Sequence, residues 1–97
     1  MNYIVGDIGN TSTRICLLNK SKILKSIVTD TNKIFLKGYI KKIINKLNKD
    51  NLKKELLFSC VVPLALKEVK KILKQTNFKV LEIKNFNLKK MIKINIK

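Results

Sequence analysis

The sequence has no histidine or tryptophan, only two cysteines, and a single proline, Pro63. Cys16 and Cys60 lie far apart in apolar runs, and there is no histidine to complete a metal site or a cysteine–histidine catalytic pair with either of them. Both thiols are therefore expected to have buried structural roles.

Long apolar segments are missing too. No run approaches the roughly 18 consecutive apolar residues that a membrane-spanning helix needs. The first residues carry Asp7 where a signal peptide would carry basic residues, and no small-residue cleavage site follows. These absences predict a cytoplasmic protein without a membrane partner.

Acidic residues are scarce, since only six Asp and Glu stand against 22 Lys and Arg, for a formal net charge of +16. Such a charge invites a nucleic-acid interpretation. However, Arg14 is the only arginine, and the lysines are spread along the chain. Specific nucleic-acid surfaces rely on arginine for bidentate and stacking contacts. The composition therefore favours a solvated lysine surface with weak, salt-sensitive binding to polyanions and no specific nucleic-acid partner.

What is present suits one small domain over residues 1–97, because 45% of the residues are hydrophobic. β-rich apolar runs predict strands over 3–8, 13–18 and 23–29, and their short links predict an antiparallel meander. A continuous apolar run predicts a strand over 56–62 that is buried on both faces. Further strands are expected over 78–83, near the sheet edge, and 91–97.

Two helices are expected between these strands. Asp30, Thr31 and Asn32 offer capping side chains for the first helix. Its apolar stripe at helical spacing consists of Leu36, Ile40, Ile43, Ile44 and Leu47. Pro63 suits the first turn of the second helix. The inner stripe of that helix consists of Leu66, Val69, Ile72 and Leu73.

The element order β-β-β-α-β-α-β predicts an α/β fold with a five-stranded mixed sheet, its first strand central and helices on its faces. The ribonuclease H-like core, which sugar kinases, actin and chaperone ATPases share, has this order. We therefore expect a ribonuclease H-like (actin-like ATPase) N-terminal domain.

The segment with recognisable chemistry runs from Asp7 through Gly9, Asn10 and Thr11 to Thr13, with the sequence DIGNTST. Gly9 permits close approach of the backbone to a polyphosphate. Backbone N–H groups of the turn, with the Asn10 and Thr11 side chains, can donate to phosphate oxygens. Asp7 is an oxygen ligand suited to Mg²⁺. A β-turn without function remains an open alternative.

DIGNTST resembles the opening phosphate motif of type III pantothenate kinases. A second segment, FSCVVP at residues 58–63, resembles the Ser-Ser-Val-Val-Pro segment of that family, with Cys60 in place of the second serine. The resemblance extends in order over essentially all 97 residues. It departs at Arg14 and Cys16, where members usually have an apolar residue and a glycine.

The resemblance implies ATP-dependent phosphorylation of pantothenate to 4′-phosphopantothenate, the first step of coenzyme A biosynthesis. It implies Mg²⁺ with ATP, a monovalent cation (K⁺ or NH₄⁺), and a homodimer at full length. The phosphate- and ATP-binding residues that it implies are Asp7, Gly9, Asn10, Thr11, Ser12 and Thr13, with Asp7 also the metal ligand.

The catalytic aspartate of the family lies in a Gly-Ala-Asp-Arg motif that the resemblance places beyond Lys97. No catalytic residue is therefore assigned within residues 1–97, and this stretch is expected to be truncated and inactive by itself. A basic nucleic-acid-binding module and a non-catalytic remnant remain alternatives. Arg14 is either a phosphate contact or an exposed strand residue, and Ser59 and Cys60 either line the cleft or simply pack in a strand.

Overall fold

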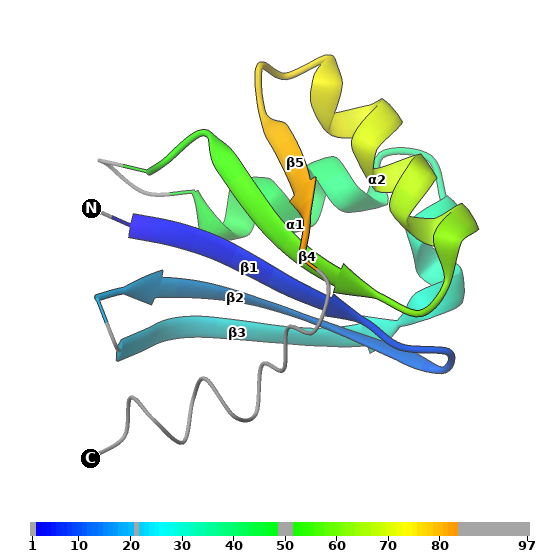
Figure 1. Cartoon of the computed structure of the whole chain (residues 1–97), viewed down its shortest axis with the longest axis horizontal. Helices are drawn as coiled ribbons and strands as arrows, with labels where there is room; N and C mark the ends of the chain where they lie inside the picture. The colour runs from blue at the N-terminus through cyan, green and yellow to red at the C-terminus, as the bar shows by residue number, and fades with distance from the viewer. Residues whose placement is uncertain (1, 21, 49–51, 84–97) are drawn as a thin grey trace.

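The computed structural model describes residues 2–20, 22–48 and 52–83. The three β-rich runs at the start form strands β1 (Asn2–Ile8), β2 (Ser12–Asn19) and β3 (Lys22–Asp30), joined as an antiparallel meander. β4 (Glu55–Cys60) and β5 (Lys79–Glu82) extend the sheet on the other side of β1, each parallel to its neighbour. The order is β3-β2-β1-β4-β5, with β1 central (Figure 1). The predicted five-stranded mixed sheet is confirmed.

Both helices, α1 (Tyr39–Leu47) and α2 (Pro63–Lys74), pack on the same face of the sheet. Their apolar stripes meet Ile4 and Ile8 of β1 and Leu56 and Phe58 of β4 in one core. The prediction of helices on more than one face is thus wrong for the described residues. The reason is topological. Both crossovers join parallel strands and move across the sheet in the same direction. Because such crossovers are right-handed, both helices lie on the same side of the sheet.

The opposite face carries a smaller apolar cluster. Val5, Cys16 and Leu18 are buried there, and Leu57 packs against them. Because side chains alternate along a strand, β4 contributes Leu56 and Phe58 to one face and Leu57 to the other. The prediction of a strand buried on both faces therefore holds for its centre, but the strand ends at Cys60, and Val61 is exposed. Cys16 is buried as predicted, whereas Cys60 is only partly buried.

The start of the first helix was predicted wrongly. Asp30 caps a short 3₁₀ helix, η1 (Thr31–Phe35), without a side-chain hydrogen bond, and α1 begins only at Tyr39. Gly38, with φ of +76°, separates the two helices. Leu36 lies in the extended link between them and is exposed, so Ile34 of η1 enters the core in its place. The rest of the predicted stripe of α1 is buried.

The second helix follows the prediction more closely. Pro63 stands at its first turn, and its inner stripe is buried except for Ile72, which is partly exposed, while Ala65 joins the core. Among the described helices, none has the length and apolar character to cross a membrane. The strand predicted over 91–97 lies outside the described residues.

Close packing between β1 and β4 explains why residue 6 is glycine. Gly6 pairs with Phe58 in the parallel register, and a Cβ at position 6 would lie 2.2 Å from the Phe58 ring. Phe58 is fully buried in the core. The ring therefore occupies the volume that any side chain at position 6 would need, just before β1 reaches Asp7.

Candidate functional site

The two motifs of the sequence meet at Asp7. β1 and β4 run parallel with Asp7 opposite Ser59, and the Ser59 hydroxyl donates a 2.7 Å hydrogen bond to Oδ1 of Asp7 across 52 residues of sequence. Ser59 is buried, whereas Asp7 is exposed. The serine thus fixes one carboxylate oxygen and leaves the other facing solvent, at the carboxyl end of the central strand.

The turn after β1 is built by backbone contacts. The Gly9 N–H donates to the Ser12 carbonyl at 3.0 Å. A Cβ on Gly9 would lie 2.9 Å from the same Ser12 oxygen, so the tightness of the turn itself requires glycine here. Asn10, Thr11 and Ser12 are exposed at the tip. Their side chains are therefore accessible, and their part in phosphate binding stays a prediction.

Thr31, at the start of η1, holds this turn. Its backbone N–H donates to the Thr11 carbonyl at 3.0 Å, and its hydroxyl donates to the Gly9 carbonyl at 2.7 Å. Its Oγ1 also lies 2.8 Å from Oγ1 of Thr13. Thr31 and Thr13 are both buried. The hydroxyl of Thr13 is thus engaged in the interior, and we expect any part that Thr13 plays in ligand binding to be indirect.

A hollow of about 390 Å³ lies between the turn and η1. Its lining residues are Asn10, Thr11, Asp30, Asn32, Lys33 and Leu36. Asp30 and Lys33 bring opposite charges to it, and Asp7 is not among the described residues that line it. The structure therefore separates the predicted residues into two groups: Asn10 and Thr11 beside the hollow, and Asp7 beside Ser59.

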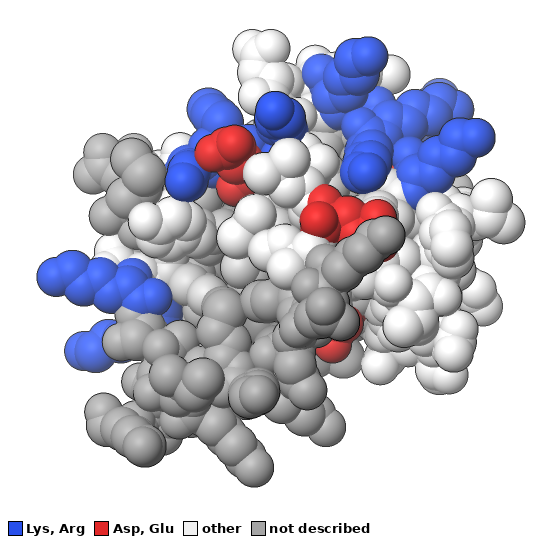
Figure 2. Space-filling model, viewed as in Figure 1, with Lys and Arg blue, Asp and Glu red and all other residues white. Residues whose placement is uncertain are grey.

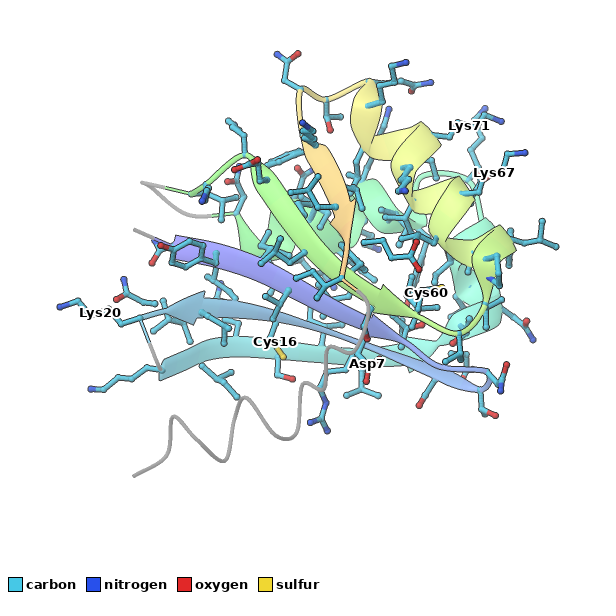
Figure 3. The ribbon with its side chains drawn as sticks, in the orientation of Figure 1. Asp7, Cys16, Lys20, Cys60, Lys67 and Lys71 are labelled. Atoms are coloured by element: carbon cyan, nitrogen blue, oxygen red, sulfur yellow. The ribbon has the colours of Figure 1, made fainter. Side chains whose placement is uncertain are left out.

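Arg14 and Cys60 flank these groups. Arg14 lies opposite Asp7 in the antiparallel register of β1 and β2 and is exposed. Cys60 lies at the end of β4, where its Sγ accepts a hydrogen bond from the Val62 N–H at 3.1 Å and contacts the Val62 carbonyl at 2.9 Å. Asp7 and Cys60 lie toward the same end of the sheet, and Lys20 lies at the opposite end (Figure 3).

Lysines cover other parts of the surface. Figure 2 shows one group of basic side chains over α2 and others well away from it. The exposed lysines of α2 are Lys67, Lys70, Lys71 and Lys74. Lys67 and Lys71 point away from the sheet (Figure 3). The absence of a specific nucleic-acid partner stays a prediction.

The sequence does not reveal the contacts of Thr31 with this turn. Asp-Thr-Asn before an apolar helical stripe predicts a helix cap at Thr31. Nothing in the local pattern marks a contact to a turn 22 residues away. Within the described ranges, no three His, Cys, Asp or Glu side chains gather to hold a metal ion. A metal at Asp7 would accordingly need water and ligand oxygens to complete its coordination.

A family model described as type III pantothenate kinase matches residues 3–97. This chain belongs to the type III pantothenate kinase family. A relative from Pelagibacter ubique (strain HTCC1062), itself described as a type III pantothenate kinase, is 40% identical over 95 residues.

The match to that pantothenate kinase covers 96% of this chain and 38% of the relative, so the chain spans well under half of the relative's length. A solved structure, from a structural study of the Aquifex aeolicus PPX-GPPA enzyme, is 17% identical with a TM-score of 0.43. That match covers 86% of this chain and 36% of the other.

Proposed function

We propose that residues 1–97 form the part of a type III pantothenate kinase that binds Mg²⁺ and the phosphates of ATP. The reaction would be the ATP-dependent phosphorylation of pantothenate to 4′-phosphopantothenate, which opens coenzyme A biosynthesis. The fold that we propose is a ribonuclease H-like (actin-like ATPase) N-terminal domain. Family membership and the order of the strands support this proposal.

The observation that carries the proposal is the hydrogen bond from Ser59 to Asp7. It joins the two segments on which the family resemblance rests, at the carboxyl ends of two parallel strands. Ligands of open α/β sheets bind at this edge. A buried serine that orients an exposed carboxylate is an arrangement suited to a metal–phosphate complex.

The residues present fit Mg²⁺ with ATP. Mg²⁺ keeps several waters and takes one or two carboxylates together with phosphate oxygens. Asp7 offers one carboxylate oxygen that Ser59 leaves free, so Asp7 would hold the ion directly or through water. When bound, Mg²⁺ supplies charge neutralisation for the phosphates. Asn10, Thr11 and Ser12 would orient the phosphates by hydrogen bonds from the turn.

The remaining parts of the reaction belong to the whole enzyme and are likewise proposals. Phosphoryl transfer needs a group that takes the proton of the acceptor hydroxyl and a site for the adenosine. The family resemblance assigns both, with the contacts to pantothenate, to segments beyond the ones matched here. A monovalent cation and a homodimer stay predictions. We expect residues 1–97 alone to bind MgATP weakly and to show no pantothenate-dependent turnover.

An NMR titration with MgATP tests the proposal. We expect the amide signals of residues 9–12 to shift, with weaker binding in Asp7→Asn because the substitution removes the metal-binding charge. Asp30→Asn is the matched control, since Asp30 is another exposed carboxylate near the turn but does not contact Ser59. We expect it to bind MgATP like the unaltered protein. A coupled ADP-release assay with pantothenate should show no turnover for residues 1–97.

Three outcomes would contradict parts of the proposal. Millimolar MgATP that leaves the amide signals of residues 9–12 unmoved would remove the phosphate-binding role. Equal weakening by Asp7→Asn and Asp30→Asn would show a general charge effect in place of a site at Asp7. Pantothenate-dependent ADP release by residues 1–97, lost in Asp7→Asn, would instead show that this stretch is catalytically sufficient.

A further inference from the structure

We propose that Thr31 is a positioning residue of the phosphate turn, which it orients so that the turn binds its anion on the side away from η1. This inference rests on the proposed function. It adds a residue outside both sequence motifs and assigns the side of the turn on which phosphate binds. Three hydrogen bonds to Thr31 carry the argument.

The direction of the hydroxyl bonds follows from the groups involved. The Gly9 carbonyl can only accept, so the single hydroxyl proton of Thr31 goes to it. The Thr31 oxygen must then accept from the Thr13 hydroxyl, 2.8 Å away. The result is a chain from Thr13 to Thr31 to the Gly9 carbonyl. Such chains strengthen each member bond, and this one is shielded from water because Thr13 and Thr31 are buried.

Thr31 therefore holds two carbonyls of the turn. Its hydroxyl binds the Gly9 carbonyl, and its backbone N–H binds the Thr11 carbonyl. In a trans peptide unit, the C=O and the following N–H point in opposite directions. With both carbonyls aimed at Thr31, the N–H groups of Asn10 and Ser12 point away from it. Two backbone donors thus have a fixed direction away from Thr31, and N–H groups of a turn held in this way can bind an anion.

The Asp7 carboxylate and the Thr13–Thr31 contact lie on opposite faces of the sheet. Thr13 points to the helix-covered face, where its hydroxyl meets Thr31. Asp7 follows Val5 by two residues, and Val5 belongs to the cluster on the opposite face, so the Asp7 carboxylate projects from that opposite face. The hollow between the turn and η1 is lined by Asn10 and Thr11 together with Asn32 and Lys33. Because the N–H groups of Asn10 and Ser12 point away from Thr31, an anion that they bind would lie outside this hollow.

The test measures binding of pyrophosphate and MgATP by NMR and calorimetry in Thr31→Val, which keeps the shape of the side chain and removes the hydroxyl. We expect binding roughly tenfold weaker, the change that corresponds to one hydrogen bond. Thr29→Val is the matched control. Thr29 is a buried threonine two residues earlier, but its hydroxyl meets the Tyr39 hydroxyl and not the turn. We expect its affinity to stay within about twofold of the unaltered protein.

Two further variants distinguish a positioning role of Thr31 from a purely stabilising role and from anion binding in the hollow. Thr31→Ser keeps the hydroxyl and should restore affinity even if it lowers the unfolding temperature. Lys33→Met removes the cation of the hollow and should leave affinity within about twofold of the unaltered value. In the unaltered protein, which needs no variant to fold, the largest amide shifts on adding pyrophosphate should be those of Asn10 and Ser12.

Distinct results would overturn the inference. If the unaltered protein binds but Thr31→Val and Thr29→Val match it in affinity, Thr31 is structural only, and the proposed function stands. If the largest shifts fall on Asn32 and Lys33, or Lys33→Met weakens binding as much as Thr31→Val, the anion occupies the hollow. If the unaltered protein binds neither probe, the proposed phosphate site itself fails and this inference fails with it.

Discussion

The meander contains two hairpin turns of different construction. The turn between β1 and β2 is tight at Gly9 and is held from outside by Thr31. The turn between β2 and β3, at the opposite end of the sheet, contains Lys20 in a left-handed conformation with φ of 55°. The first turn has glycine at position 9, where a side chain would be too close to the Ser12 carbonyl oxygen. The second turn has lysine at position 20, although its positive φ would favour glycine. The first turn is thus constrained by contacts with its surroundings, which is consistent with the binding role that we propose for it.

The largest effect is expected beneath the first turn, from Gly6→Ala. The added methyl would lie 2.2 Å from the buried Phe58 ring, and neither strand can move apart without breaking the central sheet. We expect a loss of about 3 kcal/mol in the free energy of unfolding, measured by urea denaturation. Val28→Ala on β3, where Val28 is 59% exposed, is the control and should change stability by less than about 0.5 kcal/mol. Equal effects would contradict the packing argument.

Gly9→Ala should have the next largest effect. Its methyl would meet the backbone oxygen of Ser12 at 2.9 Å, and backbone yields less readily than a side-chain end. We expect a loss of about 1–2 kcal/mol in unfolding free energy, with amide shifts concentrated in residues 9–12. A variant as stable as the unaltered protein, with unchanged amide signals, would show that the turn tolerates a side chain.

Ser59→Ala should have a smaller effect on stability and a clearer one on binding. Asp7 is exposed, so water replaces the lost hydrogen bond, and we expect a loss of about 1 kcal/mol or less. MgATP binding should weaken several-fold, about threefold to tenfold, because the carboxylate is no longer oriented. Ser26→Ala, which removes a hydroxyl that meets Cys16 on β2, should leave binding unchanged. Loss of stability without loss of affinity would assign Ser59 to packing alone.

The smallest effect, and the only favourable one, is expected from Lys20→Gly in the second turn. Glycine adopts positive φ without a Cβ penalty, although it loses more backbone entropy on folding. We expect a gain of about 0.5 kcal/mol in unfolding free energy. Lys22→Gly is a change of the same type at the first residue of β3, where φ is not positive, and it should destabilise the protein by a similar amount. Destabilisation by Lys20→Gly would show that the lysine side chain stabilises this turn, and the contrast between the two hairpins would fail.

The sequence by itself determined the elements whose signals are local. Alternation and short links predicted the meander, continuous apolar residues predicted the buried centre of β4, and Pro63 marked the start of α2. Gly9 and its polar neighbours predicted the exposed turn. In each case the signal lies in the types and spacing of neighbouring residues, so a local pattern is enough to reveal it.

Only the tertiary structure decided the rest. The hydrogen bond of Ser59 to Asp7 and the contacts of Thr31 to Gly9 and Thr11 join residues that no local pattern connects. A threonine hydroxyl can cap a helix or bind a distant carbonyl, and the local pattern at Thr31 predicts only the cap. The pairing of the strands brings the Gly9 carbonyl within reach of Thr31. The placement of both helices on one face follows from the direction of two crossovers. Such choices depend on which distant groups meet when the strands pair, and a hydroxyl contacts whichever partner the folded backbone brings within its reach.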